Sequence, residues 1–200
     1  MSDQPPKSGS EDAGSVIGPP EALNGPIVLV EYQPEWPSQY EREASRIRAA
    51  LADRALVVEH VGSTSVPGLA AKPRIDILLV VPNSGDEASY IPDLVAAGYV
   101  LRIREPDWHE HRVFKGPDVD LNLHTFSADC REIERMVRFR DRLRSDAEDR
   151  AHYEQTKRSL ARRTWKVTQD YADAKADVVD TILSRIGVQP LGDHPCPGPA

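Results

Sequence analysis

The sequence predicts an α+β fold, in which a mixed β-sheet is packed with helices and the C-terminal helices follow the sheet. Segments with strand patterns come mainly in the first two thirds of the chain, and helical segments fill the last third. The run 74–81 (RIDILLVV) is almost continuously apolar, which is typical of a central strand buried on both faces. Strands that come first and helices that come last indicate α+β architecture.

Periodicity places the individual elements. Trp36, Tyr40, Ile47 and Leu51 recur at helical spacing, which predicts a helix around them. Between 119 and 126, apolar and polar residues alternate, as in a strand with one buried face. The predicted strands are 27–30, 56–61, 74–81, 99–104, 110–115 and 119–126, and the predicted helices are 34–53, 86–97, 129–145, 147–163 and 169–187.

The chain of 200 residues suits one domain with a tail at each end. Residues 1–25 are rich in Ser, Gly, Pro and acidic residues, and residues 188–200 (VQPLGDHPCPGPA) contain four prolines. Both segments bury too little apolar surface to offset the entropy of ordering, so we expect them to be disordered. The folded domain is predicted to span 26–187.

Composition excludes several classes of function. The net charge is -7 and no long run of Lys or Arg occurs, which argues against generic nucleic-acid or membrane-surface binding. No apolar run approaches 18 residues, so no membrane span is expected, and the N-terminus lacks the apolar core of a secretory signal. We expect a cytoplasmic protein, in which a local basic pocket can still bind phosphate.

The segment 60–79 (HVGSTSVPGLAAKPRIDILL) is the most informative for function. A predicted strand ends at Gly62, whose missing side chain lets a ligand approach the backbone, and a Gly-Ser-Thr turn can hold phosphate oxygens. The next strand carries Asp76 within an apolar run, where a carboxylate needs a metal ion or a cation as partner. Alternatively, Asp76 binds loop N–H groups in a purely structural role. The candidate phosphate ligands in the loop are Gly62, Ser63, Thr64 and Ser65.

A second polar set lies on the strand 119–126. Asp120, Asn122 and His124 project from one face of this strand. If Asp120 meets Asp76 beside the loop, the two carboxylates and a phosphate would form a Mg²⁺ site. The alternation is equally the normal pattern of a solvent-facing strand, and the pattern alone favours that interpretation.

Histidines and lysines supply further candidates. His109 and His111 share a face of the predicted strand 110–115, and with His124 they form a weakly supported transition-metal hypothesis. Most basic residues of the helical region are expected to be solvated. The lysines that we expect to neutralise phosphate charge are Lys72, next to the loop, and Lys157 and Lys175 in the helical region.

Several blocks of the sequence resemble the GrpB family. They are VEY and PEW (30–36), GSTSVPGLAAKPRIDI (62–77), FKGPDVDLNLHTF (114–126), FRDRLR (139–144), YEQTKRSLA (153–161) and YADAK (171–175). Together they cover nearly all of 26–187. The resemblance implies a nucleotidyltransferase-like fold.

The resemblance also implies roles for particular residues. In the nucleotidyltransferase superfamily a Gly-Ser pair grips the triphosphate, an Asp-x-Asp pair on the next strand binds the metal, and a later carboxylate completes the site. Gly62 and Ser63 match the Gly-Ser pair, Asp76 matches the first acid, and Asp120 matches the later one. The second position of the acid pair holds Leu78, which leaves two carboxylates in place of three.

Two classes of function follow. The first is a metal-dependent nucleotidyltransferase that binds a nucleoside triphosphate and Mg²⁺ through the loop, Asp76 and Asp120, with His124 as a proton donor or acceptor. The second is a non-catalytic module that binds a nucleotide, a CoA-related ligand or another phosphorylated small molecule and supports a partner enzyme. Leu78 favours the second class, whereas the polar residues that come from several separated segments favour the first. In some proteins a GrpB-like domain is fused to dephospho-CoA kinase, which hints at a nucleotide or CoA-related ligand or at a supporting role for a partner enzyme. A ligase-like transfer to an amine is a third alternative.

Overall fold

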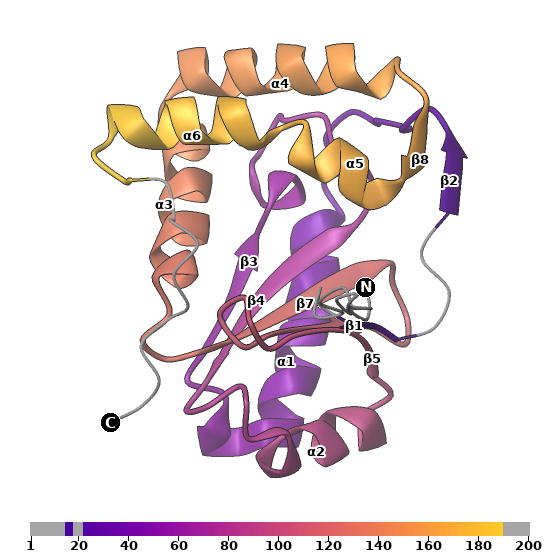
Figure 1. Ribbon diagram of the computed structural model, residues 1–200, viewed down its shortest axis with the longest axis vertical. Helices are drawn as coiled ribbons and strands as arrows, with labels where there is room; N and C mark the ends of the chain where they lie inside the picture. Colours follow the sequence, from indigo (N-terminus) through magenta and orange to yellow (C-terminus); the bar gives the residue numbers. More distant parts are fainter. Residues whose placement is uncertain (1–14, 18–21, 190–200) are drawn as a thin grey trace, which may run out of the picture.

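The computed structural model describes residues 15–17 and 22–189 of the chain. A six-stranded mixed sheet runs through its centre with the strand order β1-β5-β6-β7-β4-β3 (Figure 1). β4 and β7 are parallel, and the other neighbouring pairs in this sheet are antiparallel. The predicted α+β fold is therefore confirmed. The strands are β1 (Ser15–Val16), β3 (Val57–Val61), β4 (Ile75–Val81), β5 (Val100–Glu105), β6 (His111–Lys115) and β7 (Leu121–Ser127).

Helices cover both faces of this sheet. α1 and α2 lie on one face, α3 lies against the other, and α4 and α6 lie across one end of the sheet (Figure 1). A second, two-stranded sheet pairs β2 (Ala22–Gly25) with β8 (Trp165–Val167). The helices are α1 (Trp36–Leu51), α2 (Ile91–Ala96), α3 (Arg131–Ser145), α4 (Ala147–Ala161), α5 (Thr168–Asp173) and α6 (Ala176–Arg185).

The main core lies between α1 and the sheet. The helix buries one stripe of side chains at helical spacing, from Trp36 to Leu51, and Pro37 is accommodated in its first turn. The stripe packs on the odd-numbered residues of β4, including Ile75 and Ile77. Burying these side chains stabilises the fold by roughly 1.5–3 kcal/mol for each large one.

The even-numbered residues of β4 point to the opposite face, where the environment changes along the strand. Leu78 and Val80 are buried with Phe126 beneath α3. Asp76 lies at the start of the strand, beyond this apolar cluster, and its side chain keeps 29% exposure. The site described below is built on this uncovered end of the face.

The loop that joins β3 to β4 is held by the C-terminal helices. Val66 and Leu69 of this loop are fully buried in an apolar cluster with Tyr153 of α4 and Val178 and Ile182 of α6. A turn between two strands is thereby fixed by side chains from the far end of the sequence. This packing sets the position of the turn at 62–65 relative to the sheet.

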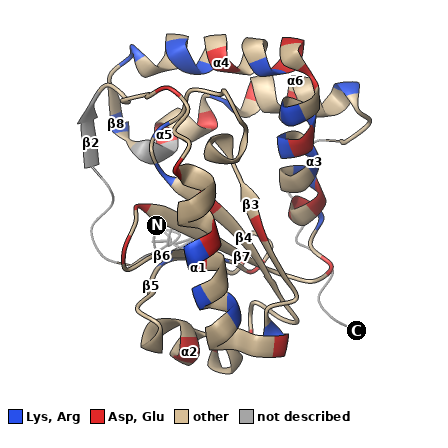
Figure 2. Cartoon of the chain, turned by 180° about the vertical axis from the view of Figure 1, so that it is seen from behind, with Lys and Arg blue, Asp and Glu red and all other residues tan. Residues whose placement is uncertain are grey.

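Charged residues of both signs are interspersed along α3 and α4 (Figure 2). This mixture fits the expectation that most basic residues of the helical region are solvated. Within the described ranges, none of the helices combines the length and the apolar character needed to cross a bilayer.

The predicted strands from 56–61 onward and the helices 34–53, 129–145 and 147–163 are confirmed, with ends within two residues of those expected. The predicted helix 86–97 is shorter, because only Ile91–Ala96 is α-helical and a 3-10 turn precedes it at Glu87–Ser89.

Other predictions were wrong. The run 27–30 forms no strand ladder: Val30 makes a single antiparallel bridge with Ala71, and Ile27 is buried against α4 and α5 side chains instead. The predicted helix 169–187 is divided into α5 and α6, and the β-branched and aromatic segment before it forms β8. Two strands, β1 and β2, lie in the segment 1–25 that was expected to be disordered, because β5 and β8 supply backbone partners for them. The end of the other predicted tail, 190–200, lies outside the described residues.

Candidate functional site

The turn after β3 and the carboxylate of Asp76 are in direct contact. Val61 and Asp76 are cross-strand partners, and Gly62 follows with a φ of +67°, a conformation that favours glycine. A Cβ atom at Gly62 would lie 2.4 Å from Oδ2 of Asp76. Glycine is therefore required at position 62 for two reasons: the backbone conformation there favours glycine, and the carboxylate of Asp76 leaves no room for a side chain. The predicted proximity of loop and carboxylate is present; its chemical role stays a prediction.

Two of the loop hydroxyls hold the turn in shape. Residues Ser63–Ser65 form a 3-10 turn, in which Oγ of Ser65 donates to the carbonyl of Gly62 at 2.6 Å. Oγ1 of Thr64 donates to the carbonyl of Arg74 at 3.3 Å, and both hydroxyl-bearing side chains are buried. Both hydroxyl protons are therefore already used, and neither Thr64 nor Ser65 has a free hydroxyl donor for the predicted contact with phosphate.

Ser63 differs from its neighbours. Among the described residues, neither its hydroxyl nor the amide groups of Ser63 and Thr64 make a hydrogen bond, and the side chain is only half-buried. Amides at the start of a helical turn are donors without a helical partner. These groups, beside Gly62, are the ones that a phosphate oxygen can use.

Asp76 takes its partners from β7. The parallel register places Asn122 beside Asp76 and His124 beside Leu78, so all three polar side chains share a face. Nδ2 of Asn122 donates to Oδ1 of Asp76 at 3.0 Å, and Nε2 of His124 lies 3.7 Å from the same oxygen. The structural alternative, in which Asp76 accepts from loop amides, finds no such bond among the described residues.

The environment keeps Asp76 ionised. Burial, the largest single effect, would raise the pKa of Asp76, but the interactions with His124, Asn122 and Lys175 together outweigh burial and lower that pKa below its usual value. Among these three, His124 lowers the pKa most, followed by the hydrogen bond from Asn122 and the positive charge of Lys175. A negative charge next to the open end of the turn is the condition for binding a cation there.

A row of interacting side chains continues from His124 across the sheet, and it ends at Glu105, which the sequence did not single out. Nδ1 of His124 lies 3.1 Å from Nε2 of His111, and Nδ1 of His111 lies 2.6 Å from Oε2 of Glu105. The His111 ring is buried and stacks on Phe126, with ring centroids 4.5 Å apart. Register alone brings these residues together, since β5, β6 and β7 are neighbours.

The hydrogen-bond inventory of this row assigns the protons. Burial lowers the pKa of His111 to about 4, so the ring is neutral near pH 7 and has one N–H, which it donates to Glu105. Its other nitrogen must then accept from Nδ1–H of His124. Nε2 of His124 faces the Asp76 carboxylate and therefore needs a proton or a cation between the two groups.

Asp120 lies on the same face as Asp76 but is engaged elsewhere. It precedes Leu121, the register partner of Ile75, so it lies one step beyond Asn122 along this face. Nε of Arg74 lies 2.8 Å from its Oδ1, and Nζ of Lys115 lies 3.7 Å away. Any Mg²⁺ bound by both acids has to compete with Arg74. The two carboxylates still fit the oxygen donors that Mg²⁺ prefers.

The three lysines that were predicted to bind phosphate lie in different surroundings. Lys157 is buried, donates from Nζ to the carbonyl of Ala70 and lies 4.9 Å from the centroid of the Tyr153 ring. Burial, and next the charge of Lys175, lower the pKa of Lys157 to about 7. Lys175 stands where α5 and α6 separate, and its charge acts on both Lys157 and Asp76. Lys72 is half-buried and has a partner of its own.

Glu132 was missed by the sequence interpretation. It lies in the first turn of α3, and burial raises its pKa to about 7, against the opposing charges of Arg135 and His124. Nε of Arg135 lies 3.6 Å from Oε2 of Glu132, so the carboxyl group has a charged partner on its own helix. A signal was available, because Glu132 shares the stripe of Met136 and Leu143 on the apolar side of the helix.

The transition-metal hypothesis finds little support. His109 lies in the turn before β6 with a φ of +58°, so the prediction that it shares a strand face with His111 was wrong. Within residues 15–17 and 22–189, no group of three or more His, Cys, Asp or Glu side chains is arranged to hold a metal ion.

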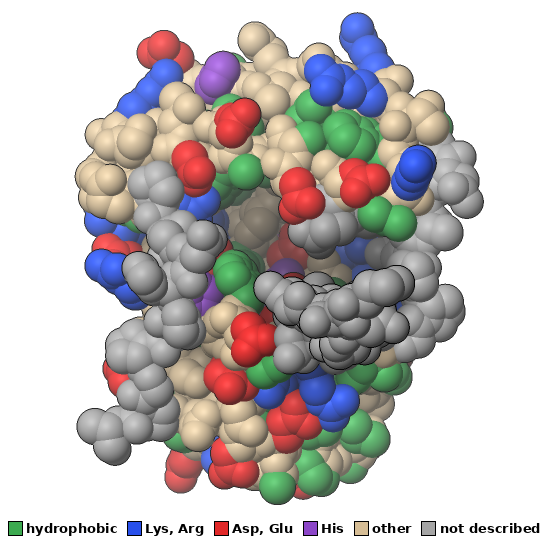
Figure 3. Space-filling view, viewed as in Figure 1, with side chains coloured by type: hydrophobic (Ala, Val, Ile, Leu, Met, Phe, Trp, Pro, Cys, Tyr) green, Lys and Arg blue, Asp and Glu red, His purple; other side chains and the backbone are tan. Residues whose placement is uncertain are grey.

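Figure 3 shows a hollow near the centre of one face of the molecule, with histidine side chains at its edge.

Comparison with known proteins decides the family. Residues 26–185 match the family whose description is GrpB protein. The chain belongs to the GrpB family. A UPF0157 protein of Halalkalibacterium halodurans is 55% identical over 184 residues, which cover 92% of this chain and 94% of that relative. A dephospho-CoA kinase of Mycolicibacterium paratuberculosis is 32% identical over 164 residues, which cover 69% of this chain and 40% of the kinase.

One solved structure of a relative has the same fold. The conserved protein GrpB from Enterococcus faecalis is similar with a TM-score of 0.64 and 31% identity, over 77% of this chain and 98% of that chain. A structure of the Cid1 poly(U) polymerase bound to MgATP has a TM-score of only 0.42, with 12% identity over 64% of this chain and 45% of that chain. The fold of this GrpB chain is thus shared with a solved member of its own family.

Leu78 has a clear structural place in this GrpB chain. It is fully buried with Val61 and Phe126 beneath α3, although its register partner is His124. An acid at this position would be buried among apolar side chains at a cost of several kcal/mol unless it were paired. The polar part of the site is therefore limited to the start of β4 and to side chains from β7.

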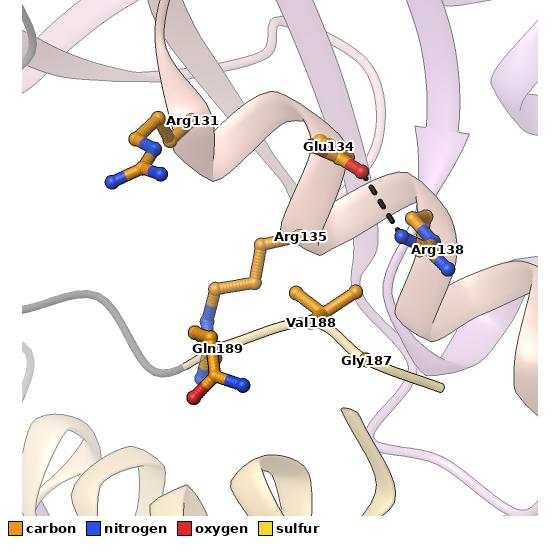
Figure 4. Close-up of a pocket in the computed structure, with 7 residues that line it drawn as sticks. All are labelled: Arg131, Glu134, Arg135, Arg138, Gly187, Val188 and Gln189. Carbon is orange, nitrogen blue, oxygen red and sulfur yellow. Dashed lines mark hydrogen bonds and ion pairs between the residues drawn. The ribbon is translucent and has the colours of Figure 1, made fainter. Parts of the chain in front are cut away.

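A small cavity of about 170 Å³ lies elsewhere, between α3 and residues 187–189 (Figure 4). Arg138 pairs with Glu134 at 3.1 Å and donates to the carbonyl of Ile186 at 2.8 Å. The hydrogen bond to Ile186 fastens the end of α6 to α3. The cavity is lined by none of the residues around Asp76.

Proposed function

We propose that this GrpB protein binds a nucleoside triphosphate with Mg²⁺ at the Gly62–Ser63 turn and transfers a nucleotidyl group to an acceptor. The observation that carries the proposal is the contact between Gly62 and the ionised carboxylate of Asp76, next to donors of Ser63 that have no partner among the described residues. The family resemblance supports the same assignment, since Gly62, Ser63 and Asp76 occupy the matching positions.

The residues divide the work as follows. Ser63 and the amides of the turn hold phosphate oxygens, while Asp76, and Asp120 once it leaves Arg74, hold Mg²⁺. When bound, Mg²⁺ supplies positive charge against the phosphates. Lys175 and a protonated Lys157 add to this charge. The likeness to known nucleotidyltransferases extends to two of the three acids, with Leu78 in place of the third.

The transfer joins an acceptor oxygen or nitrogen to the α-phosphorus and breaks its bond to the bridging oxygen, so that pyrophosphate leaves. The acceptor proton passes to His124, whose Nε2 lies 3.7 Å from the carboxylate of Asp76. Catalysis then consists mainly of positioning and electrostatic stabilisation.

The test is thermal unfolding with a panel of nucleoside triphosphates, with and without Mg²⁺. We expect stabilisation only when both are present, by about 2.7 kcal/mol at a hundredfold excess over Kd. Asp76→Asn should lose this stabilisation, whereas Asp53→Asn, an exposed aspartate on another element, should keep it. Absence of a shift with every nucleotide would count against the proposal.

The alternative function is a non-catalytic module for a nucleotide or a CoA-related ligand that supports a partner enzyme. Leu78 favours it, because the site has two acids at most. This module would bind its ligand without Mg²⁺ and release no pyrophosphate with any acceptor. Pyrophosphate release, measured beside the binding experiment with hydroxyl and amine acceptors, separates the two functions.

The lowered pKa of Lys157 predicts that nucleotide binding takes up a proton. At pH 8 the free protein holds this lysine mostly neutral, because burial lowers its pKa to about 7. A triphosphate nearby favours the charged form and raises that pKa. We expect an uptake approaching one proton, measured by calorimetry in buffers of different ionisation enthalpy. Lys157→Met should abolish the uptake and Lys166→Met, at an exposed position, should keep it; equal uptake in both variants would refute the assignment.

A further inference from the structure

A larger cavity, of about 600 Å³, runs along the free edge of β3. β3 is the last strand of the sheet, and the cavity lies between it, α1 and the ends of α3 and α4 that meet there. Neither Asp76 nor Ser63 nor His124 lines it. Its volume is in the usual range of small-molecule pockets. We refer to it as the β3-edge groove.

Four arginines line this groove, in a chain whose net charge is -7. Arg140 is neutralised by Glu59 at 2.7 Å and Asp141 at 2.8 Å. The other three arginines differ, because backbone carbonyls hold them in place. They are Arg48, which donates to Val58 at 3.0 Å, Arg144, which donates to Ser65 at 2.8 Å, and Arg150, which donates to Leu143 at 3.1 Å.

A carbonyl orients a guanidinium group without cancelling its charge. Among the described residues, no carboxylate lies within 4.0 Å of the guanidinium nitrogens of Arg48 or Arg150, and the nearest one to Arg144 is Asp141 at 3.9 Å. Each of these three groups also keeps N–H donors that the carbonyls do not use. The groove therefore presents three oriented guanidinium groups, of which only Arg144 has a carboxylate within 4.0 Å among the described residues.

The remaining walls suit a compact anion. Tyr40 and His60 stack with ring centroids 4.8 Å apart, and His60 adds no charge, because burial lowers its pKa to about 4. The acidic residues lining the groove are Glu41 and Glu59, and Glu59 already pairs with Arg140. Guanidinium groups bind phosphate through paired N–H donors, and several phosphates on one ligand can engage several arginines together.

We infer that the β3-edge groove binds a polyphosphate anion at Arg48, Arg144 and Arg150, without Mg²⁺ and separately from the Asp76 site. Such an anion can be inorganic polyphosphate or the phosphate tail of a nucleotide. The groove adjoins the turn of the first site, because Arg144 holds the carbonyl of Ser65 and His60 bonds Thr64 at 3.1 Å. A bound anion would thus lie directly behind the turn that faces Asp76.

The experiment is calorimetric titration of the full chain with inorganic tripolyphosphate in EDTA. Binding should weaken at least tenfold in the double variant Arg48→Gln/Arg150→Gln. The matched control, Arg131→Gln/Arg163→Gln, removes the same charge at exposed positions outside the groove and should stay within about twofold of the parent protein. ATP used in place of tripolyphosphate tells whether a nucleoside is accepted, and inorganic phosphate should bind much more weakly than either.

Two further variants allow the inference to be tested independently of the double variant. Asp76→Asn should leave tripolyphosphate binding in EDTA unchanged, which separates this groove from the proposed nucleotide site. Glu41→Gln removes a lining negative charge at an exposed position and should tighten binding severalfold, so the inference can be tested even if the double variant does not fold. No binding of tripolyphosphate, equal loss in the control pair, loss in Asp76→Asn, or no tightening in Glu41→Gln would each overturn it.

Discussion

Replacing Gly62 by alanine is expected to abolish Mg²⁺-dependent nucleotide binding and to destabilise the protein. The added Cβ would lie 2.4 Å from Oδ2 of Asp76, so the carboxylate or the turn has to move. The φ of +67° with a ψ of -174° lies in a region essentially restricted to glycine, which adds a backbone cost of about 1–3 kcal/mol for a residue with a side chain. Thermal unfolding with and without nucleotide and Mg²⁺ measures both effects.

The chain offers a matched control for this substitution. Gly68 has a φ of +77°, and an added Cβ there would meet nothing within 4 Å. Gly68→Ala should therefore also carry a backbone cost for its positive φ but leave nucleotide binding intact. If the two variants lose stability equally and both retain binding, then the closeness of Gly62 and Asp76 is not important for the site.

The Gly62–Asp76 pair shows what the sequence could predict. A glycine that ends one strand and an acid inside the next apolar run are both local patterns, and two antiparallel neighbours bring them together. The central strands were predicted for the same reason, since their alternation or continuous apolar character is visible within seven residues. Local patterns thus gave the sheet and the start of the site.

The rest of the site depends on strand order, which single-strand patterns do not contain. Glu105, His111 and His124 meet only because β5, β6 and β7 are neighbours in a particular register. Likewise, Arg74 pairs with Asp120 because β4 lies beside β7, and so the sequence could not show that this acid is engaged. In the same way, the pKa of Glu132 is raised by burial where α3 packs on the sheet, a contact between helix and strand.

The elements that were predicted wrongly have similar causes. The run 27–30 has strand composition but its neighbours are α4 and α5 side chains and the single bridge at Ala71. β8 forms only because β2 pairs with it, and a three-residue strand has too short a pattern to identify alone. In both cases tertiary contacts override local propensity.

Acidification is expected to destabilise this GrpB protein between pH 6.5 and pH 4. Burial lowers the pKa of His60 and of His111 to about 4 in the folded state, against 6.5 when unfolded. Between these values the unfolded chain binds more protons than the folded one, so the free energy of unfolding falls as the pH falls. Each histidine contributes at most about 3 kcal/mol to this loss, at 1.36 kcal/mol per pKa unit.

The charged groups that face each histidine do not change the direction of its pKa shift, so they do not change the direction in which stability depends on pH. His60 faces Asp76, which raises its pKa, and Arg140 and Arg144, which lower it. His111 faces Glu105, which raises its pKa, and His124, which lowers it. In both cases burial is the largest effect, and the resulting pKa stays well below 6.5. Asp76 acts in a separate window, because its pKa is lowered from 3.8 and its contribution is lost only at still lower pH.

Urea unfolding at a series of pH values between 4 and 7.5 tests this expectation, with the slope of stability against pH as the readout. His111→Gln should reduce the slope clearly, because it removes one of the two buried histidines, whatever the variant loses in stability at neutral pH. Glu132, whose pKa burial raises to about 7, acts with the opposite sign in this window, but it does so equally in both proteins. His152→Gln, at an exposed histidine on α4, should leave the slope unchanged. A slope that His111→Gln does not alter would mean that this ring is already charged in the folded protein, and His124 would then no longer be required to donate toward it.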